Sequence, residues 1–139
     1  MGHPEPPRIF VIAEAGVNHN GDTDRTLAMI DAAGAAGADA VKFQSFHADQ
    51  LATAQAPRAP YQQNDADADD SQLEMLRGLE LDAGAHHRLA ARCHETGVEF
   101  LSTPFDTASL EFLVRKIEVR KLKIGSGEIS NGPLLLAAA

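Results

Sequence analysis

Two lysines in this sequence have neighbours that suggest a binding site for an anion. Lys42 and Gln44 are two residues apart in KFQ, so on an extended strand their side chains point to the same side. Lys123 opens KIGSGE, in which two glycines flank Ser126. Glycines let backbone amides approach a ligand, and Ser126 adds a hydroxyl, so this combination suits a phosphate or a carboxylate. The alternatives are a lysine that reaches from a strand end to water and a plain glycine turn.

A carboxylate and two hydroxyls stand at comparable places. Glu14 lies in AEAGVNHNGD directly after an apolar run, where it can orient a sugar hydroxyl or move a proton. Ser102 and Thr103 in STPFD can donate to a ligand or can belong to an ordinary strand-to-helix turn. We interpret Asp106 as a helix cap rather than a catalyst.

The histidines show no paired metal-binding spacing such as HExxH. His19 lies between two asparagines, and we interpret it as either a ligand or a turn residue. Four others are interpreted as mostly solvated: His47, His86, His87 and His94.

Short apolar runs alternate with helical patterns about four times along the chain. The runs predict strands at residues 9–13, 40–43, 99–101 and 119–124. Helices are predicted from Asp22 or Thr23 to about Gly37, from Asp82 to Thr96, from the cap at Asp106, and from Pro133. A long loop at 47–71 follows the second strand, and SQLEMLRGLE predicts a short helix after it.

This alternation predicts an α/β fold with parallel strands, either a doubly wound sheet or part of a (β/α)8 TIM-type barrel. Polar residues directly after every strand favour the barrel, because its chemistry gathers at the carboxyl ends of the strands. A whole barrel needs about 250 residues. We therefore expect residues 1–139 to be the N-terminal half of a barrel, with about the first four β/α units present.

Composition narrows the class of protein. The net charge is -8, which argues against a nucleic-acid or anionic-membrane partner. The single cysteine, Cys93, excludes an internal disulfide and fits a reducing compartment. Neither a signal peptide nor an apolar stretch long enough for a membrane span is recognisable, so we expect a cytoplasmic protein.

Five blocks, in order and at suitable spacing, resemble the N-acetylneuraminate (sialic acid) synthase family: AEAGVNHNGD, GADAVKFQSF, QLEMLRGLEL, EFLSTPFD and LKIGSGEISN. The resemblance covers nearly the whole chain from about Ile9. It implies a barrel enzyme that condenses phosphoenolpyruvate with N-acetylmannosamine or a related amino sugar, forming a nonulosonic acid and phosphate. It also implies a divalent metal, typically Mn2+, and a homodimer completed by an antifreeze-like domain. KFQSF, STPFD and KIGSGE are nearer to neuraminate and legionaminate synthases than to pseudaminate synthases.

The resemblance also implies roles for individual residues. Positions that hold phosphoenolpyruvate match Lys42, Thr103, Lys123 and Ser126; positions near the sugar match Gln44, Asn64 and Phe105; and the catalytic carboxylates match Glu14 and Glu128. The family's metal is held by histidines of later strands, so its ligands are expected outside this chain. KIEV at 116–119 departs from the family's usual glycine-containing turn.

Three hypotheses remain at this point. The chain is a segment of a sialic-acid-type synthase, which we expect to be inactive alone. Alternatively, it is a truncated non-catalytic remnant or an interaction module. Within enzymes, the alternative is another phosphoenolpyruvate–aldose synthase.

Overall fold

The computed structural model describes residues 8–52 and 72–139 of the chain. Within these ranges the strands are β1 (Ile12–Gly16), β2 (Ala40–Ser45) and β3 (Glu99–Pro104). The α-helices are α1 (Thr23–Ala35), α2 (Ala48–Leu51), α3 (Gln72–Leu79), α4 (Ala83–Thr96), α5 (Thr107–Phe112) and α6 (Gly132–Ala138). A π-helical turn at Leu113–Ile117 continues α5, and a 3-10 turn spans Ser126–Glu128. No helix in these two ranges is long and apolar enough to cross a membrane.

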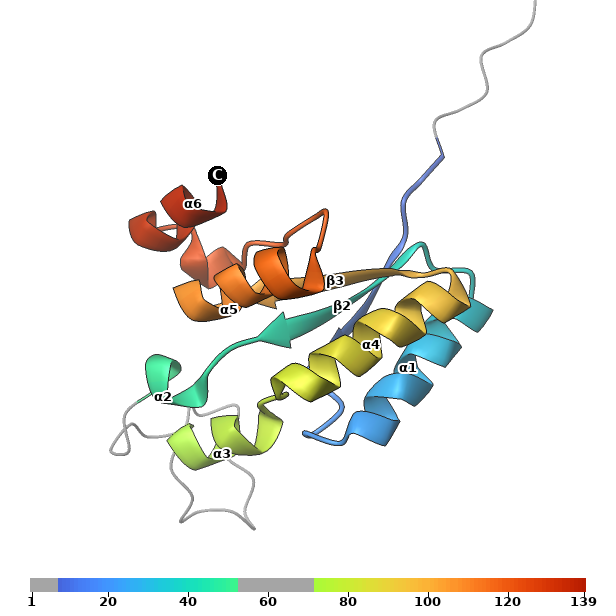
Figure 1. Cartoon of the computed structure of the whole chain (residues 1–139), viewed down its shortest axis with the longest axis horizontal. Helices are drawn as coiled ribbons and strands as arrows, with labels where there is room; N and C mark the ends of the chain where they lie inside the picture. Colours follow the sequence, from blue (N-terminus) through green and yellow to red (C-terminus); the bar gives the residue numbers. More distant parts are fainter. Residues whose placement is uncertain (1–7, 53–71) are drawn as a thin grey trace, which may run out of the picture.

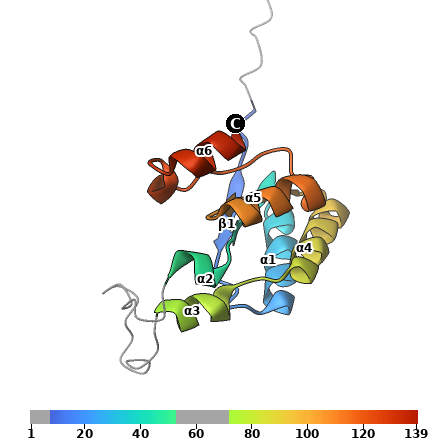
Figure 2. The same ribbon diagram turned by 60° about the vertical axis from the view of Figure 1, so that its left-hand side comes forward.

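The three strands form one parallel sheet in the order β1-β2-β3, as the alternating pattern predicts. Helix α1 connects β1 to β2, and α4 leads into β3. Figure 1 shows α1 and α4 side by side along one face of the sheet, while α5 flanks β3 and α6 packs against α5. Strand β1 lies at the edge of this sheet opposite β3, and the turned view in Figure 2 shows α2 beside α3.

The predicted helix ends are confirmed by their caps. The side chain of Asp22 accepts hydrogen bonds from the backbone of Asp24 and Arg25 at the start of α1. Asp82 caps α4 in the same way, and Gly97 ends that helix in the left-handed conformation. A carboxylate at each helix start satisfies amides that have no partner inside the helix, which is why these aspartates fix the boundaries.

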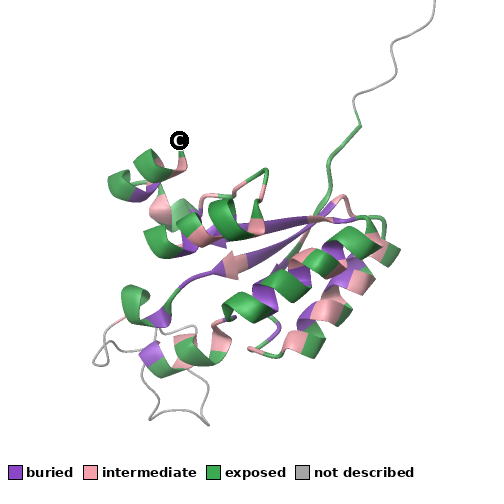
Figure 3. Cartoon of the chain, in the orientation of Figure 1, coloured by how far each residue is buried: buried purple, intermediate pink, exposed green. Residues whose placement is uncertain are grey.

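The core lies between the sheet and the two helices α1 and α4 (Figure 3). Phe43 is fully buried and stacks on Phe100, with ring centroids 5.9 Å apart. Ile30 of α1 and Leu89 of α4 are buried against the same cluster. Every second residue of a strand therefore packs against the helices, and the residues between them face the other side of the sheet.

The first strand begins later than predicted. Residues 9–11 are exposed, and the paired strand covers Ile12–Gly16. The carbonyl of Val11 accepts bonds from Asp39 and Ala40 before the ladder starts. Apolar composition located the run, but pairing with β2 decides where the strand begins.

The fourth predicted strand, at 119–124, is wrong. The segment has irregular backbone, and its recorded backbone bond to β3 is Lys123 N–H to the Ser102 carbonyl, at 3.4 Å. Val119 and Leu122 pack partly against the core, while Lys121 stays exposed in an ion pair with Glu99. A short run containing Val119, Leu122 and Ile124 predicted a strand, but one long backbone bond does not make a ladder.

Glu118 explains part of this irregularity. It ends the π-helical turn with φ 59° and ψ 41°, in the left-handed region that glycine adopts without strain. Glu118 lies in KIEV, the segment that was expected to depart from the family's glycine-containing turn. A residue with a Cβ costs about 1–2 kcal/mol in this conformation.

Glycine is required at Gly21, in the loop between β1 and α1. Its φ is 74°, and a Cβ placed there would lie 2.3 Å from the carbonyl oxygen of Gly78 in α3. The loop of the AEAGVNHNGD block thus approaches the backbone of α3 closely. This contact holds that loop beside the carboxyl end of the sheet.

Candidate functional site

Four side chains that the sequence singles out lie on the face of the sheet opposite α1 and α4. The register pairs Glu14 with Lys42, and Gln44 with Thr103. All four stand at or near the carboxyl ends of their strands, where barrel enzymes carry their chemistry. The residues between them, such as Phe43, enter the core on the helix side.

Lys42 is the centre of this group. It is only 5% exposed, yet its Nζ lies 2.9 Å from Oε1 of Glu14 and donates to Oγ1 of Thr103 at 3.3 Å. A buried ammonium without partners would cost several kcal/mol, so these contacts make its position possible. The Glu14 side chain is 58% exposed, so the ion pair is open to solvent on that side.

Gly16 leaves room for the polar side chains around it. A Cβ at this position would lie 3.2 Å from Oε1 of Glu14 and 3.8 Å from Nε2 of Gln44. A β-bulge between Glu14 and Gly16 shifts the register at the same point. Together, the bulge and the missing side chain let Glu14 and Gln44 gather beside Lys42.

The KIGSGE loop meets the STPFD block at Gly125. A Cβ there would lie 3.4 Å from the ring of Phe105 and 3.6 Å from Cγ2 of Thr103. Phe105 is half-buried, and its backbone N–H donates to the carbonyl of Ser45 at 3.1 Å. The loop therefore borders the same strand ends that carry Lys42 and Thr103.

The remaining predicted residues are more dispersed. Lys123 and Ser126 are exposed, and no recorded contact joins either side chain to Lys42. Glu128 accepts a hydrogen bond from Asn131 at 2.7 Å, and Asn131 caps α6. The structure thus places Glu128 beside a helix start rather than beside Glu14, and Asn64 lies outside the described residues.

Two histidines are buried, contrary to the expectation for one of them. His86, predicted to be solvated, is buried between Phe100 and Phe112, both of which it meets edge-on. Its position on α4 faces the core, on the same side of the helix as Leu89 and Cys93. His19 is also buried, and its Nδ1 accepts from the Gly21 amide, so it is a loop residue packed inward.

Burial keeps both imidazoles neutral. The pKa of His86 is lowered chiefly by burial, and the hydrogen bond to the Asp82 carbonyl opposes this only in part. The pKa of His19 is lowered by burial and by the nearby His86. An uncharged ring in an apolar layer is the expected form of a buried histidine.

Asp106 is a helix cap, as interpreted from the sequence. Its carboxylate accepts from the Ser109 amide at 2.6 Å and from the His47 amide at 2.8 Å. Burial alone would raise the pKa of Asp106, but the hydrogen bonds from Ser109 and His47 hold it below its usual value. These bonds fix the turn that follows β3 and leave the carboxylate no role at the sheet face.

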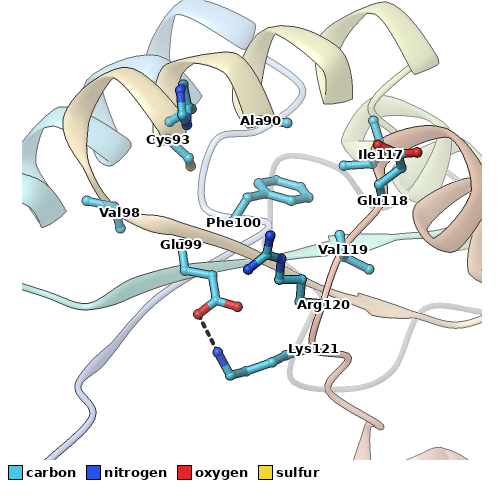
Figure 4. A pocket seen from close by; sticks show the side chains of 11 residues that line it. Ala90, Cys93, Val98, Glu99, Phe100, Ile117, Glu118, Val119, Arg120 and Lys121 are labelled. Atoms are coloured by element: carbon cyan, nitrogen blue, oxygen red, sulfur yellow. Dashed lines mark hydrogen bonds and ion pairs between the residues drawn. The ribbon is translucent and has the colours of Figure 1, made fainter.

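A cavity of about 500 Å3 lies at the opposite end of β3 (Figure 4). It opens between α4, the start of β3 and residues 117–121, and the ion pair of Glu99 with Lys121 stands at its edge. Cys93 lines it, but burial raises the pKa of that thiol to about 12, so it stays protonated and unreactive. The amino ends of barrel strands serve stability, and none of the four sheet-face residues lines this cavity.

Across residues 8–52 and 72–139, no group of three or more His, Cys, Asp or Glu side chains is arranged to hold a metal ion. The donor set around Lys42 is one carboxylate, one amide and one hydroxyl beside an ammonium. An ammonium in that position repels a cation, so these residues suit an anion instead.

The family model that matches this chain is that of the NeuB family, and it matches residues 29–139. The chain belongs to the NeuB family. The matched span contains the KFQ, STPFD and KIGSGE blocks, so the NeuB match covers Lys42, Thr103 and Lys123.

Similar proteins agree with this NeuB assignment. The N,N'-diacetyllegionaminic acid synthase of Legionella pneumophila is 48% identical over 126 residues, covering 91% of this chain and 35% of the relative. That of Campylobacter jejuni is 45% identical over 128 residues, covering 92% of this chain and 38% of the relative. The chain therefore spans somewhat more than a third of the length of these relatives.

A solved structure extends the comparison to the fold. The N-acetylneuraminic acid (sialic acid) synthetase of Leptospira borgpetersenii, solved with citrate, matches with a TM-score of 0.77 and 31% identity, covering 99% of this chain and 45% of that chain. The predicted α/β class is confirmed, and this NeuB chain has the fold of part of a TIM-type barrel.

Sequence reasoning missed two residues of the buried layer between the sheet and α4, Ser45 and His86. Ser45 directly follows Gln44 in KFQSF, so strand alternation alone places it on the helix side. The same alternation places Ser102 behind the sheet, although it was considered as a ligand donor together with Thr103. Applying the period of two to both strands would have separated Thr103 from Ser102.

Proposed function

We propose that this chain carries the phosphoenolpyruvate side of a nonulosonic acid synthase site. The proposed reaction joins phosphoenolpyruvate to an N-acetylated amino sugar; water then adds to the phosphate-bearing carbon, and phosphate is released. The observation that carries the proposal is the buried Lys42, which is held between Glu14 and Thr103 on the open face of a NeuB-family sheet. A buried ammonium that can be reached from solvent on one side is suited to bind an anion there.

Phosphoenolpyruvate fits this cation because it carries a phosphate and a carboxylate. An ammonium has three donors, and two of those on Lys42 are directed to Glu14 and Thr103. The third donor can bind an anionic oxygen, and the Thr103 hydroxyl lies within reach of the same oxygen. In the proposal Lys123 and Ser126, on the exposed loop beside Gly125, bind the other anionic end. Two cations at separate points would fix both the position and the orientation of the substrate.

Glu14 would act at the reacting carbons. Its carboxylate would repel a bound phosphate, but it would stabilise the positive charge that develops at the phosphate-bearing carbon when the methylene carbon of phosphoenolpyruvate adds to the sugar aldehyde. It is exposed enough to exchange protons with solvent. Gln44 and Phe105, which border the same space, are proposed to contact the sugar, as is Asn64 from the long loop. Glu128 remains the second proposed carboxylate and would need the Asn131 contact to open before it could act.

The resemblance also implies Mn2+, which would polarise the sugar aldehyde as a Lewis acid. The described residues do not form a site for it, so the proposal places its ligands elsewhere and assigns no step of this chain to the metal. We further propose that the 1–139 segment acts as the amino-terminal half of a barrel, within a cytoplasmic homodimer. The amino sugar is proposed to be diacetylated, because the two relatives above are named for an N,N'-diacetyl product.

A segment exchange tests this function. The chain would replace the matched third of the Legionella pneumophila relative, and phosphate release would be measured with phosphoenolpyruvate, the amino sugar and Mn2+. We expect sugar-dependent phosphate release from the chimera and none from the 139-residue chain alone. A folded chimera that releases no phosphate would contradict the proposal and favour a non-catalytic module.

A further inference from the structure

A chain of buried hydrogen bonds lies directly behind the proposed site. The hydroxyl of Ser45 is 2.7 Å from Nε2 of His86 and 2.7 Å from the hydroxyl of Ser102. Nδ1 of His86 is 2.9 Å from the carbonyl oxygen of Asp82. The three side chains are buried, with exposed fractions of 2%, 4% and 0% for Ser45, His86 and Ser102.

The direction of each bond follows from the chemistry of its acceptor. A backbone carbonyl only accepts, so Nδ1 of His86 carries the proton and donates to Asp82. In the neutral ring Nε2 is then bare, and it accepts from the Ser45 hydroxyl. The hydroxyl proton of Ser45 is used in the bond to His86, so Ser102 donates to Ser45. Each member therefore has one defined role, and the imidazole is held in one tautomer.

These bonds fasten the ends of the two strands that carry the site. The pairing of β1 with β2 ends at Phe43, so of the strands in the described residues only β3 pairs with Gln44 and Ser45. Ser45 is the next residue after Gln44, and Ser102 immediately precedes Thr103. A bond between the two serines on one face thus fixes the spacing of Gln44 and Thr103 on the other.

We infer that Ser45, Ser102 and His86 form a positioning network for the strand ends that bind phosphoenolpyruvate and the sugar. This inference rests on the proposed function and adds three residues to it. His86 anchors the network to α4, because its ring is wedged edge-on against Phe100 and Phe112. The network sets the separation of Gln44 and Thr103, and through Thr103 the position of the Lys42 ammonium.

A serine beside a histidine also occurs in hydrolases, but this pair lacks the other parts. The third member is the Asp82 carbonyl rather than a carboxylate, and the Ser45 oxygen is tied to Ser102 on its other side. A catalytic nucleophile needs access to a substrate carbonyl, whereas Ser45 is almost completely buried. The network acts on the sheet and not on a ligand.

The test compares Ser45→Ala with Thr26→Val in the full chain. Thr26 is another buried hydroxyl, but it donates to the carbonyls of Asp22 and Thr23 at the start of α1. The first readout is the NMR signal of the Gln44 side-chain amide and of the Thr103 methyl, without ligand. We expect both signals to move in Ser45→Ala and in His86→Leu, and to stay in place in Thr26→Val. In His86→Gln, which retains an acceptor, both signals should lie nearer to those of the wild type. Unmoved Gln44 and Thr103 signals in Ser45→Ala would overturn the inference whether or not the chain binds a ligand.

The second readout is the Kd for phosphoenolpyruvate. We expect Ser45→Ala to raise it about tenfold and Thr26→Val to leave it within about twofold, although both variants lose a buried hydrogen bond. An equal rise in Kd in the two variants would mean that the network only stabilises the fold, and it would overturn the positioning role. A wild-type chain that binds no phosphoenolpyruvate would contradict the proposed function, and the ligand-free signals would still decide the positioning of the strand ends.

Discussion

The ammonium of Lys42 and the carboxylate of Glu14 lie 2.9 Å apart across the β1–β2 pair, at matched positions of the register. One partner is buried and the other is half open to water. The pair therefore does more than link two strands, because any anion that approaches Lys42 must share it with Glu14. Two of the predictions below follow from this competition.

Replacing Glu14 by Gln should separate ligand binding from turnover. Loss of the carboxylate removes a negative charge near Lys42, so we expect phosphoenolpyruvate to bind several-fold more tightly, by about 1 kcal/mol. In the segment-exchange synthase, turnover should fall by about 100-fold or more, because a carboxylate that moves protons or stabilises charge is gone. Calorimetric titration and phosphate release measure the two effects.

The matched control for this variant is Glu95→Gln, at an exposed position on α4, which covers the other face of the sheet. It changes the net charge equally and should leave both quantities near their wild-type values. If Glu14→Gln weakened phosphoenolpyruvate binding instead, the carboxylate would be holding Lys42 in place rather than competing for it.

The stability of the chain should decrease as the pH falls below about 6.5. Burial lowers the pKa of His19 and His86 in the folded chain, whereas in the unfolded chain both have the ordinary histidine pKa of about 6.5. Below that value the unfolded chain binds more protons, so the free energy of unfolding declines as the pH falls through the folded pKa values. Above about pH 7 both rings are neutral in either state, and this contribution is fully present.

Urea unfolding at a series of pH values checks this dependence. His86→Gln should flatten the decline between pH 7 and 5, because one of the two buried imidazoles is removed. His87→Gln, at an exposed neighbouring position on α4, should leave the slope unchanged. A slope that is the same in all three proteins would show that the buried rings do not cause the acid sensitivity.

Replacing Glu118 by Gly should stabilise the chain. Glu118 has a positive φ of 59°, and glycine removes the steric cost of that conformation. The flexibility of glycine in the unfolded chain offsets part of the gain, so we expect roughly 0.5–1 kcal/mol in the free energy of unfolding. Glu118→Ala is the control, because it removes the charge but keeps the Cβ, and it should give little or none of the gain.

The sequence predicted most of what local chemistry determines. Aspartates at helix starts located α1, α4 and α5, and the two-residue spacing of Lys42 and Gln44 put both on one face. The reading of apolar runs as strands was less reliable near residue 120. The apolar residues of 119–124 predicted a strand, but strand formation depends on a paired neighbour, which sequence composition does not report.

The sequence predicted the residues of the site better than it predicted the contacts between them. Lys42 and Thr103 are brought together, whereas Glu128 lies against Asn131 and Lys123 stays exposed. The burial of His86 was missed although the helical period places it on the same side of α4 as the buried Leu89 and Cys93. Its partner Ser45 comes from a strand 41 residues away, and such contacts arise only when the chain folds.

A titration of the chain measures directly whether Lys42 binds phosphoenolpyruvate. Phosphoenolpyruvate is added to the wild type, to Lys42→Ala and to Lys116→Ala in a phosphate-free buffer, and Kd is determined by calorimetry. Lys116 is an exposed lysine on the π-helical turn, so its removal changes the net charge equally without touching the sheet face.

We expect one saturable site in the wild type and in Lys116→Ala, and a loss of about 100-fold or more in Lys42→Ala, which corresponds to about 3 kcal/mol. Lys123→Ala should show a smaller loss, because that side chain is exposed and screened by solvent. Equal affinity in the wild type and in a correctly folded Lys42→Ala would contradict the account.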